Sequence, residues 1–481
     1  MTQVKKNFIY NVLYQVLTIV LPLITVPYVS RKLGANGIGT YSYTYSVMSY
    51  FLMFALLGIN NYGNRLIAKN KDNKINMSKE FLSLYAFQII TTSIMILLYL
   101  IYVSIGNVQY KIIAYIQSIY LVANMFDFNW FFFGLEKFKI TITRNILIKI
   151  ISFIFIIIFI KNEEDIWKYT LILALSVLLS QIALIPILKK NIVKVKIKSK
   201  DVKKHIKPVL ILFIPCIAIS VYKTMDKIML GNMSNIKEVG FYEQSEKIIN
   251  IPMGIITALG TVMLPKISNL VANNDKEQVS NYISKSVMFA MFLAFPICFG
   301  LLATSKSFIP ILLGEEFNRA IIITNLLSIT IIFISFANVL RTQYILPNEM
   351  DLSYVLSVSA GAVINFIANI IFIPKYGAVG ACIGTILAEF LVMFCNIIAV
   401  RKQLPIRKYM KSTLPFFVKG FIMFIVTYTV SMIQINKIEN LILTTLTGII
   451  IYCLLNEKYI NSIIDIKKLI INKKLSIKQK E

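Results

Sequence analysis

Ionisable side chains gather in two neighbouring apolar stretches of this 481-residue sequence, at about 209–230 and 241–264. In chain order they are Lys223, Asp226, Lys227, Glu243, Glu246 and Lys247. A spacing of four residues places Lys223 and Lys227 on one face of a helix, and Glu243 and Lys247 on one face of the next. Each such group costs roughly 2.5–3.5 kcal/mol inside a bilayer, so a cluster of them indicates a role. Two roles fit: binding an anion, or an ion-pair cluster that pins the two helices together.

Three other charged residues in or at the ends of apolar stretches are candidates for a functional role. Asp127, between Phe126 and Phe128, fits a sugar contact or cation site, or a polar residue beside an interfacial aromatic belt. Glu389 lies near the middle of its stretch and fits either a proton carrier or a neutral carboxyl bonded between helices. Arg31 ends the first stretch and is expected to face the lysines.

Catalytic and metal-binding patterns are missing from the sequence. It contains one histidine, His205, and five cysteines in apolar runs with no Cys-x-x-Cys pair: Cys216, Cys298, Cys382, Cys395 and Cys453. A zinc site and a disulfide framework are therefore disfavoured. We expect no metal and no cofactor, and we expect His205 and the cysteines to be dispensable.

The composition requires a membrane around most of these residues. Hydrophobic residues make up 57% of the chain and charged residues 15%, against about 45–50% and 25% in soluble domains. A cytosolic enzyme, a secreted disulfide scaffold and a disordered chain are excluded. Spanning stretches, which must be helices in lipid, occur at about 8–29, 41–60, 81–105, 111–133, 145–160, 168–188, 209–230, 241–264, 286–305, 320–340, 354–373, 377–400, 413–434 and 440–456.

The formal net charge of +27 follows largely from topology. Most lysines and arginines fall on one side of the fourteen spans, which is the cytoplasmic side by the positive-inside rule. Both termini are then cytoplasmic, and no nucleic-acid partner is needed. The basic run 189–207 is either a linker or a contact with anionic lipid headgroups.

A weak repeat divides the chain into two lobes. The segments that carry it are Arg31-Lys32-Leu33-Gly34 with Gly39-Thr40-Tyr41, and Asp226-Lys227-Ile228-Met229-Leu230-Gly231 with Val239-Gly240-Phe241-Tyr242. The predicted fold is an all-α polytopic membrane protein of about fourteen transmembrane helices. Its predicted parts are a six-helix lobe (1–190), a basic cytoplasmic linker (191–208), a second six-helix lobe (209–400), helices thirteen and fourteen (401–456) and a basic cytoplasmic tail (457–481).

These motifs, together with Pro374-Lys375-Tyr376-Gly377-Ala378-Val379-Gly380-Ala381, resemble the multidrug/oligosaccharidyl-lipid/polysaccharide exporter superfamily. Within it, the chain is most similar to the Wzx-type flippases of O-antigen and capsule repeat units, over about residues 5–400. The resemblance implies two six-helix lobes around a central cavity. It also implies movement of an undecaprenyl-pyrophosphate-linked oligosaccharide across the bacterial cytoplasmic membrane by alternating access.

The leading hypothesis is thus a transporter, not an enzyme, for cell-surface polysaccharide biosynthesis. Its expected partners are the lipid-linked oligosaccharide, membrane lipids and other polysaccharide-assembly proteins. Arg31, Lys223, Lys227 and Lys247 are expected to bind the pyrophosphate. The expected ion-coupling or cavity acids are Asp127, Asp226, Glu243 and Glu389. The alternatives are a drug/cation antiporter of the same superfamily, a membrane polysaccharide polymerase or ligase, and a passive assembly scaffold.

Overall fold

The computed structural model of the chain describes residues 3–106, 108–433 and 436–462. Within these ranges, the side chains of 3–20, 214–216, 218–223 and 261–262 are not described. Every regular element in this part of the chain is a helix, and each predicted span falls within one or two of them. Eleven helical stretches among these residues are long and apolar enough to cross a membrane. The structure therefore confirms the all-α polytopic fold class.

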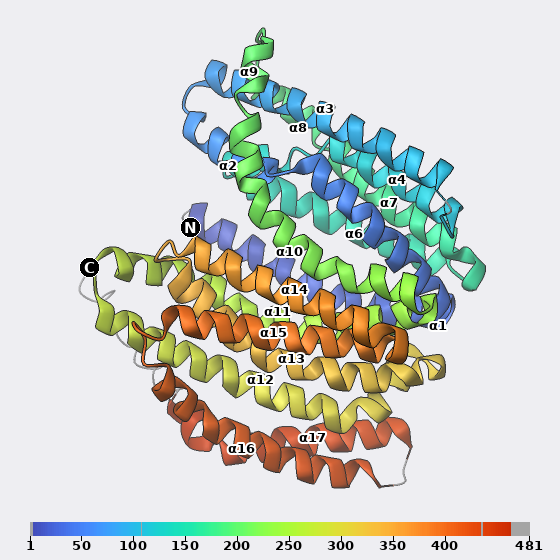
Figure 1. Cartoon of the computed structure of the whole chain (residues 1–481), viewed down its shortest axis with the longest axis vertical. Helices are drawn as coiled ribbons and strands as arrows, with labels where there is room; N and C mark the ends of the chain where they lie inside the picture. The colour runs from blue at the N-terminus through green and yellow to red at the C-terminus, as the bar shows by residue number, and fades with distance from the viewer. Residues whose placement is uncertain (1–2, 107, 434–435, 463–481) are drawn as a thin grey trace. The chain divides into compact units, whose positions relative to one another are not determined.

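The first half of the chain contains long helices and shorter helices that connect them (Figure 1). They are α1 (Gln3–Leu56), α2 (Ile59–Asn70), α3 (Lys74–Ile105), α4 (Lys111–Met125), α5 (Asn129–Gly134), α6 (Phe138–Phe159), the 3₁₀ turn η1 (Glu163–Asp165), α7 (Ile166–Ile182), α8 (Ile185–Asn191) and α9 (Ser199–Lys203).

The second half contains longer helices. They are α10 (Ile206–Met233), α11 (Ile236–Ala272), α12 (Lys276–Leu313), the 3₁₀ turn η2 (Glu315–Arg319), α13 (Ala320–Leu340), the π turn η3 (Arg341–Ile345), α14 (Asp351–Tyr376), α15 (Ala378–Val400), α16 (Ile406–Ser431) and α17 (Lys437–Leu455).

Helix α1 contains the first two predicted spans, which are joined at Gly34. The backbone of Gly34 has φ 61° and ψ −179°, a conformation that glycine adopts without the steric cost of a Cβ. A Cβ at this position would also lie 2.8 Å from carboxylate oxygens of both Glu163 and Glu316. The first glycine of the sequence motif therefore ends one span and begins the next.

The chain divides into two compact units. Unit one comprises 1–247, 312–320 and 358–388, and unit two comprises 248–311, 321–357 and 389–481. In unit two, α16 and α17 lie side by side (Figure 1), and the Tyr452 hydroxyl donates to the Phe292 carbonyl at 2.9 Å. The predicted lobes 1–190 and 209–400 group the helices differently and stay a prediction.

In unit one, the predicted linker is bound to the start of α3. Lys204 pairs with Glu80 at 2.5 Å. His205 is fully buried, with Nδ1 at 2.9 Å from the Tyr62 hydroxyl and Nε2 at 2.8 Å from the Ser83 hydroxyl. Burial lowers the pKa of His205 to about 4, so the imidazole is neutral at physiological pH. His205 thus has a packing role, and we expect its removal to cost stability, while the expectation that the protein functions without it stays a prediction.

Candidate functional site

Four charged side chains of α10 and α11 form one connected group in unit one, which we call the charge quartet: Lys227, Glu243, Glu246 and Lys247. The Lys227 ammonium lies 2.6 Å from Glu243 and 2.7 Å from Glu246. The Lys247 ammonium lies 3.1 Å from the other oxygen of Glu243, which confirms the predicted i,i+4 pair. The quartet contains two cations and two anions, so its formal charge is balanced.

The quartet is partly accessible and is tied to α1. The side chains of Lys227 and Glu243 are each 14% exposed, whereas those of Glu246 and Lys247 are 33% and 35% exposed. The Ser42 hydroxyl of α1 donates to Glu243 at 2.7 Å. A solute could therefore reach the quartet through Glu246 and Lys247, while Lys227 and Glu243 form its buried base.

Two motif glycines allow α1 to approach α11 closely enough for that contact. A Cβ on Gly39 would strike the carbonyl oxygen of Ile236, and a Cβ on Gly240 would strike the carbonyl oxygen of Ala35. Each of these carbonyls belongs to the residue four positions before the partner glycine, so the contact is reciprocal. Small residues in membrane helices commonly allow two backbones to approach each other this closely.

Asp226 lies next to Lys227 in sequence but faces other partners. Its carboxylate accepts hydrogen bonds from the Tyr242 hydroxyl at 2.8 Å, the Thr385 hydroxyl at 2.9 Å and the Asn369 amide at 2.6 Å. Asp226 is 5% exposed. It therefore joins α10 and α11 to α14 and α15 within unit one, and its three neutral donors satisfy both carboxylate oxygens.

Tyrosines surround the α1 side of the quartet, and sequence reasoning missed them. Tyr41 stacks on Tyr45 at 5.7 Å between ring centroids and meets the edge of Tyr169 at 5.2 Å. The hydroxyls of Tyr41 and Tyr120 lie 3.0 Å apart. The available signal was the run Thr40-Tyr41-Ser42-Tyr43-Thr44-Tyr45, in which positions 41 and 45 share one helix face.

Three further predicted site residues are Arg31, Glu389 and Lys223. The Arg31 side chain lies against Gly314, with Cγ 3.5 Å from the position of a Cβ there. Glu389 is half-buried on α15 in unit two. The side chain of Lys223 is outside the described residues.

Asp127 belongs to a second polar network of unit one, at the break between α4 and α5. It is 8% exposed and accepts from the backbone and side-chain nitrogens of Asn129 at 3.0 and 2.7 Å. Arg144 of α6 donates to the side-chain amide oxygen of Asn129 at 2.9 Å and to that of Gln181 on α7 at 3.3 Å. The Asp127 carboxylate thus gives the backbone N–H of Asn129, at the start of α5, a partner.

Comparison with known proteins gives the family. Residues 4–271, more than half of the chain, match the family described as "Polysaccharide biosynthesis protein". The chain belongs to that family. It is 26% identical over 405 residues to a "Putative O-antigen transporter" of Escherichia coli K12, covering 83% of this chain and 97% of that protein. It is 28% identical over 177 residues to "Probable low-salt glycan biosynthesis flippase Agl15" of Haloferax volcanii, covering 35% of each chain.

Solved structures confirm the fold of this polysaccharide biosynthesis protein. "Lipid II flippase MurJ, inward closed conformation" superimposes with a TM-score of 0.77 over 95% of this chain and 99% of that chain, at 17% identity. An inward-facing MATE multidrug transporter of the MOP superfamily gives 0.59 over 81% and 96%, at 13% identity. The resemblance inferred from the motifs is therefore confirmed as a likeness of both family and fold.

The quartet can exchange the partners of its ion pairs. Among the residues that the structure describes, no three His, Cys, Asp or Glu side chains are grouped to hold a metal ion. What the quartet presents is two ammonium groups held within 3.1 Å of the same carboxylate. An anionic solute could replace that carboxylate as the partner of both cations.

Proposed function

We propose that this protein is a flippase that moves undecaprenyl-pyrophosphate-linked oligosaccharide repeat units across the bacterial cytoplasmic membrane. It acts without enzymatic chemistry, by alternating access. The observation that carries the proposal is the charge quartet, in which Lys227 and Lys247 converge on Glu243. A diphosphate brings two or more negative charges out of the headgroup region, and preassembled ammonium groups lower the cost of that step.

The carboxylates have a definite part in this mechanism. Without substrate, Glu243 and Glu246 neutralise Lys227, so no bare cation is buried. When the diphosphate enters beside Lys247, it takes over the ammonium groups and releases the carboxylates from them. The Ser42–Glu243 bond is then the contact through which substrate binding loosens α1 from α11.

Complementation of a strain that lacks its own repeat-unit flippase tests the proposal. Lys227→Gln should lower surface polysaccharide by about tenfold or more, the effect of about 1.4 kcal/mol, and Lys227→Arg should preserve more activity. Protein in the membrane fraction is measured in parallel. Normal transport by a stably inserted Lys227→Gln variant would contradict the assignment of the diphosphate to the quartet.

The variant that inverts all four charges, Lys227→Glu/Glu243→Lys/Glu246→Lys/Lys247→Glu, separates binding from folding. It retains all three ion pairs of the quartet, so a purely structural cluster predicts normal insertion and normal transport. Binding of diphosphate from the α10 side predicts normal insertion with reduced transport. Cysteine labelling at Glu163 and at Ser476 tests the predicted orientation, because Ser476 should be inaccessible from outside intact cells.

A second function, antiport of cationic drugs, is favoured by one observation. Asp226 is a carboxylate that is 5% exposed and bonded to neutral donors only, among them Tyr242 and Asn369. A buried carboxylate of this kind attracts a cation. Efflux of a cationic dye from inverted vesicles, driven by a sodium or proton gradient, tests it. The flippase proposal expects no gradient-driven efflux.

A further inference from the structure

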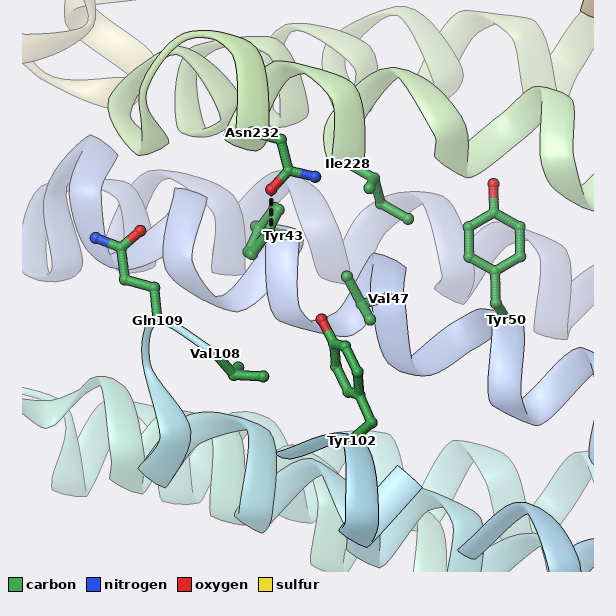
Figure 2. Close-up of a pocket in the computed structure, with 8 residues that line it drawn as sticks. All are labelled: Tyr43, Val47, Tyr50, Tyr102, Val108, Gln109, Ile228 and Asn232. Carbon is green, nitrogen blue, oxygen red and sulfur yellow. Dashed lines mark hydrogen bonds between the residues drawn. The ribbon is translucent and has the colours of Figure 1, made fainter. Parts of the chain in front are cut away.

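A pocket of about 470 Å³ lies beside α1 and α10 in unit one (Figure 2). Its lining comes from α1, α3, the connection between α3 and α4, and α10: Tyr43, Val47, Tyr50, Tyr102, Val108, Gln109, Ile228 and Asn232. Tyr43 directly follows Ser42, and Ile228 directly follows Lys227. The pocket therefore adjoins Lys227 along α10 and Ser42, the α1 partner of Glu243, along α1.

Helix periodicity and one glycine form this pocket. Tyr43, Val47 and Tyr50 are spaced i, i+4 and i+7, so they share a face of α1. The Tyr43 hydroxyl donates to the side-chain amide oxygen of Asn232 at 2.6 Å. Figure 2 marks this hydrogen bond. A Cβ on Gly231 would strike the Tyr43 ring. Gly231, at the Leu-Gly end of the second motif, thus leaves room for the Tyr43 ring. That ring forms one wall of the pocket.

The lining is polar without being charged. It consists of three tyrosines, two side-chain amides and three aliphatic residues. In the part of the chain that the structure describes, the Gln109 amide and the Tyr102 hydroxyl have no hydrogen-bond partner. An amide donates and accepts, as does a phenol, so both can serve a ligand with several hydroxyls.

We propose that this pocket binds an uncharged sugar ring of the transported glycan, an assignment that rests on the proposed flippase function. Tyrosine rings cover the C–H face of a sugar, while Gln109 and Asn232 bond to its hydroxyls. A diphosphate is disfavoured because none of the eight described lining residues carries a positive charge, and a polyprenyl tail is disfavoured by their five polar side chains. The quartet and the pocket thus divide the ligand into a charged end and a neutral end.

Saturation-transfer NMR on the full-length protein in phosphatidylcholine nanodiscs tests the proposal, with the methyl glycosides of glucose, galactose and N-acetylglucosamine as probes. Saturable binding of at least one glycoside is expected. Tyr102→Leu and Gln109→Leu should each weaken it by about tenfold, the effect of about 1.4 kcal/mol. The matched control is Tyr428→Leu on α16 in unit two, whose exposure of 45% is similar to the 38% of Tyr102. That control should leave glycoside binding unchanged.

Three outcomes would overturn the assignment. The first is equal binding by the wild type and both pocket variants, and the second is no glycoside binding by a wild-type protein that transports. The third is binding that disappears when phosphatidylglycerol replaces phosphatidylcholine, because the pocket would then hold a glycerol headgroup. If Tyr102→Leu unfolds, Gln109→Leu decides, since Gln109 lies in a connection between helices. A wild type that fails complementation would instead refute the proposed function itself.

Discussion

The two copies of the glycine motif, in α1 and in α11, have the same backbone contact. Gly39 of the first copy packs on the carbonyl of Ile236, and Gly240 of the second packs on the carbonyl of Ala35. Three residues after the glycines, Ser42 and Glu243 hydrogen-bond to each other across the same crossing. The repeat found in the sequence is therefore a real structural correspondence around one helix–helix contact.

The chemistry of the two copies differs where the backbone does not. Six positions after the glycine, the first copy has Tyr45 and the second has Glu246; seven positions after it, they have Ser46 and Lys247. The first copy thus contributes hydroxyls and rings, whereas the second, together with Lys227 of α10, contributes the charges of the quartet. A symmetric crossing with asymmetric side chains suits a ligand that is charged at one end only.

The largest predicted effect on stability concerns Ser42 and Glu243, the pair that joins the two copies. Glu243→Gln leaves Lys227 and Lys247 without their shared carboxylate, and loss of one partner of a buried ion pair costs about 3–5 kcal/mol. Ser42→Ala removes one hydrogen bond to the same carboxylate and should cost about 1–3 kcal/mol. Thermal unfolding of the purified variants in detergent measures both. Equal losses would show that charge adds nothing to the second copy.

The next effect tests the symmetry of the crossing. Gly39→Ala and Gly240→Ala each place a methyl group against a backbone carbonyl, and overpacking of this kind costs about 1–3 kcal/mol. The two losses should be similar because the contact is reciprocal. Gly300→Ala in α12 is the control, since nothing lies within 4 Å of its Cβ position. A large loss in one glycine variant only would contradict the correspondence.

The sequence predicted the spans and the pairing along α11 because both depend on local spacing. Fourteen apolar stretches became helices, and Glu243 meets Lys247 one turn away. It could not predict that Lys227 is neutralised by Glu243 and Glu246 together. That contact depends on how far α10 and α11 are rotated about their axes, which no pattern within one helix specifies.

The tyrosine run of α1 shows the same limit. Tyr41, Tyr43 and Tyr45 alternate with hydroxyl residues, a pattern that in a strand would place all three on one face. In the helix, Tyr41 and Tyr45 stack on each other, whereas Tyr43 turns towards Asn232. One short segment therefore serves both the quartet and the pocket, and only the helical geometry separates the two roles.

A smaller effect on stability is predicted outside both copies. It is the pH dependence that comes from His205, and it serves as a reference for the variants above. The pKa of buried His205 is lowered from 6.5 to about 4, so the unfolded chain binds the proton more readily between these values. The stability contribution is complete above pH 6.5 and is lost as pH falls, by about 1 kcal/mol at pH 6. Unfolding midpoints between pH 7.5 and 6 measure it. His205→Gln should flatten the pH dependence of the midpoint. Gly39→Ala should lower the midpoint by the same amount at every pH.

The smallest stability effect concerns the residue that most separates the second copy from the first. Lys247 stands where α1 has Ser46, and its side chain is 35% exposed. Its pair with Glu243 is an i,i+4 contact, worth about 0.3–0.5 kcal/mol when partly solvated. Lys247→Gln should therefore leave the unfolding midpoint nearly unchanged while weakening the binding of inorganic pyrophosphate, measured by calorimetry on the full-length protein. Lys437→Gln, at the start of α17 in unit two, is the control for a loss of one positive charge. Pyrophosphate affinity that falls equally in both variants would show that only net charge matters. A fall in Lys247→Gln alone would mark the second copy as the charged side of the binding site.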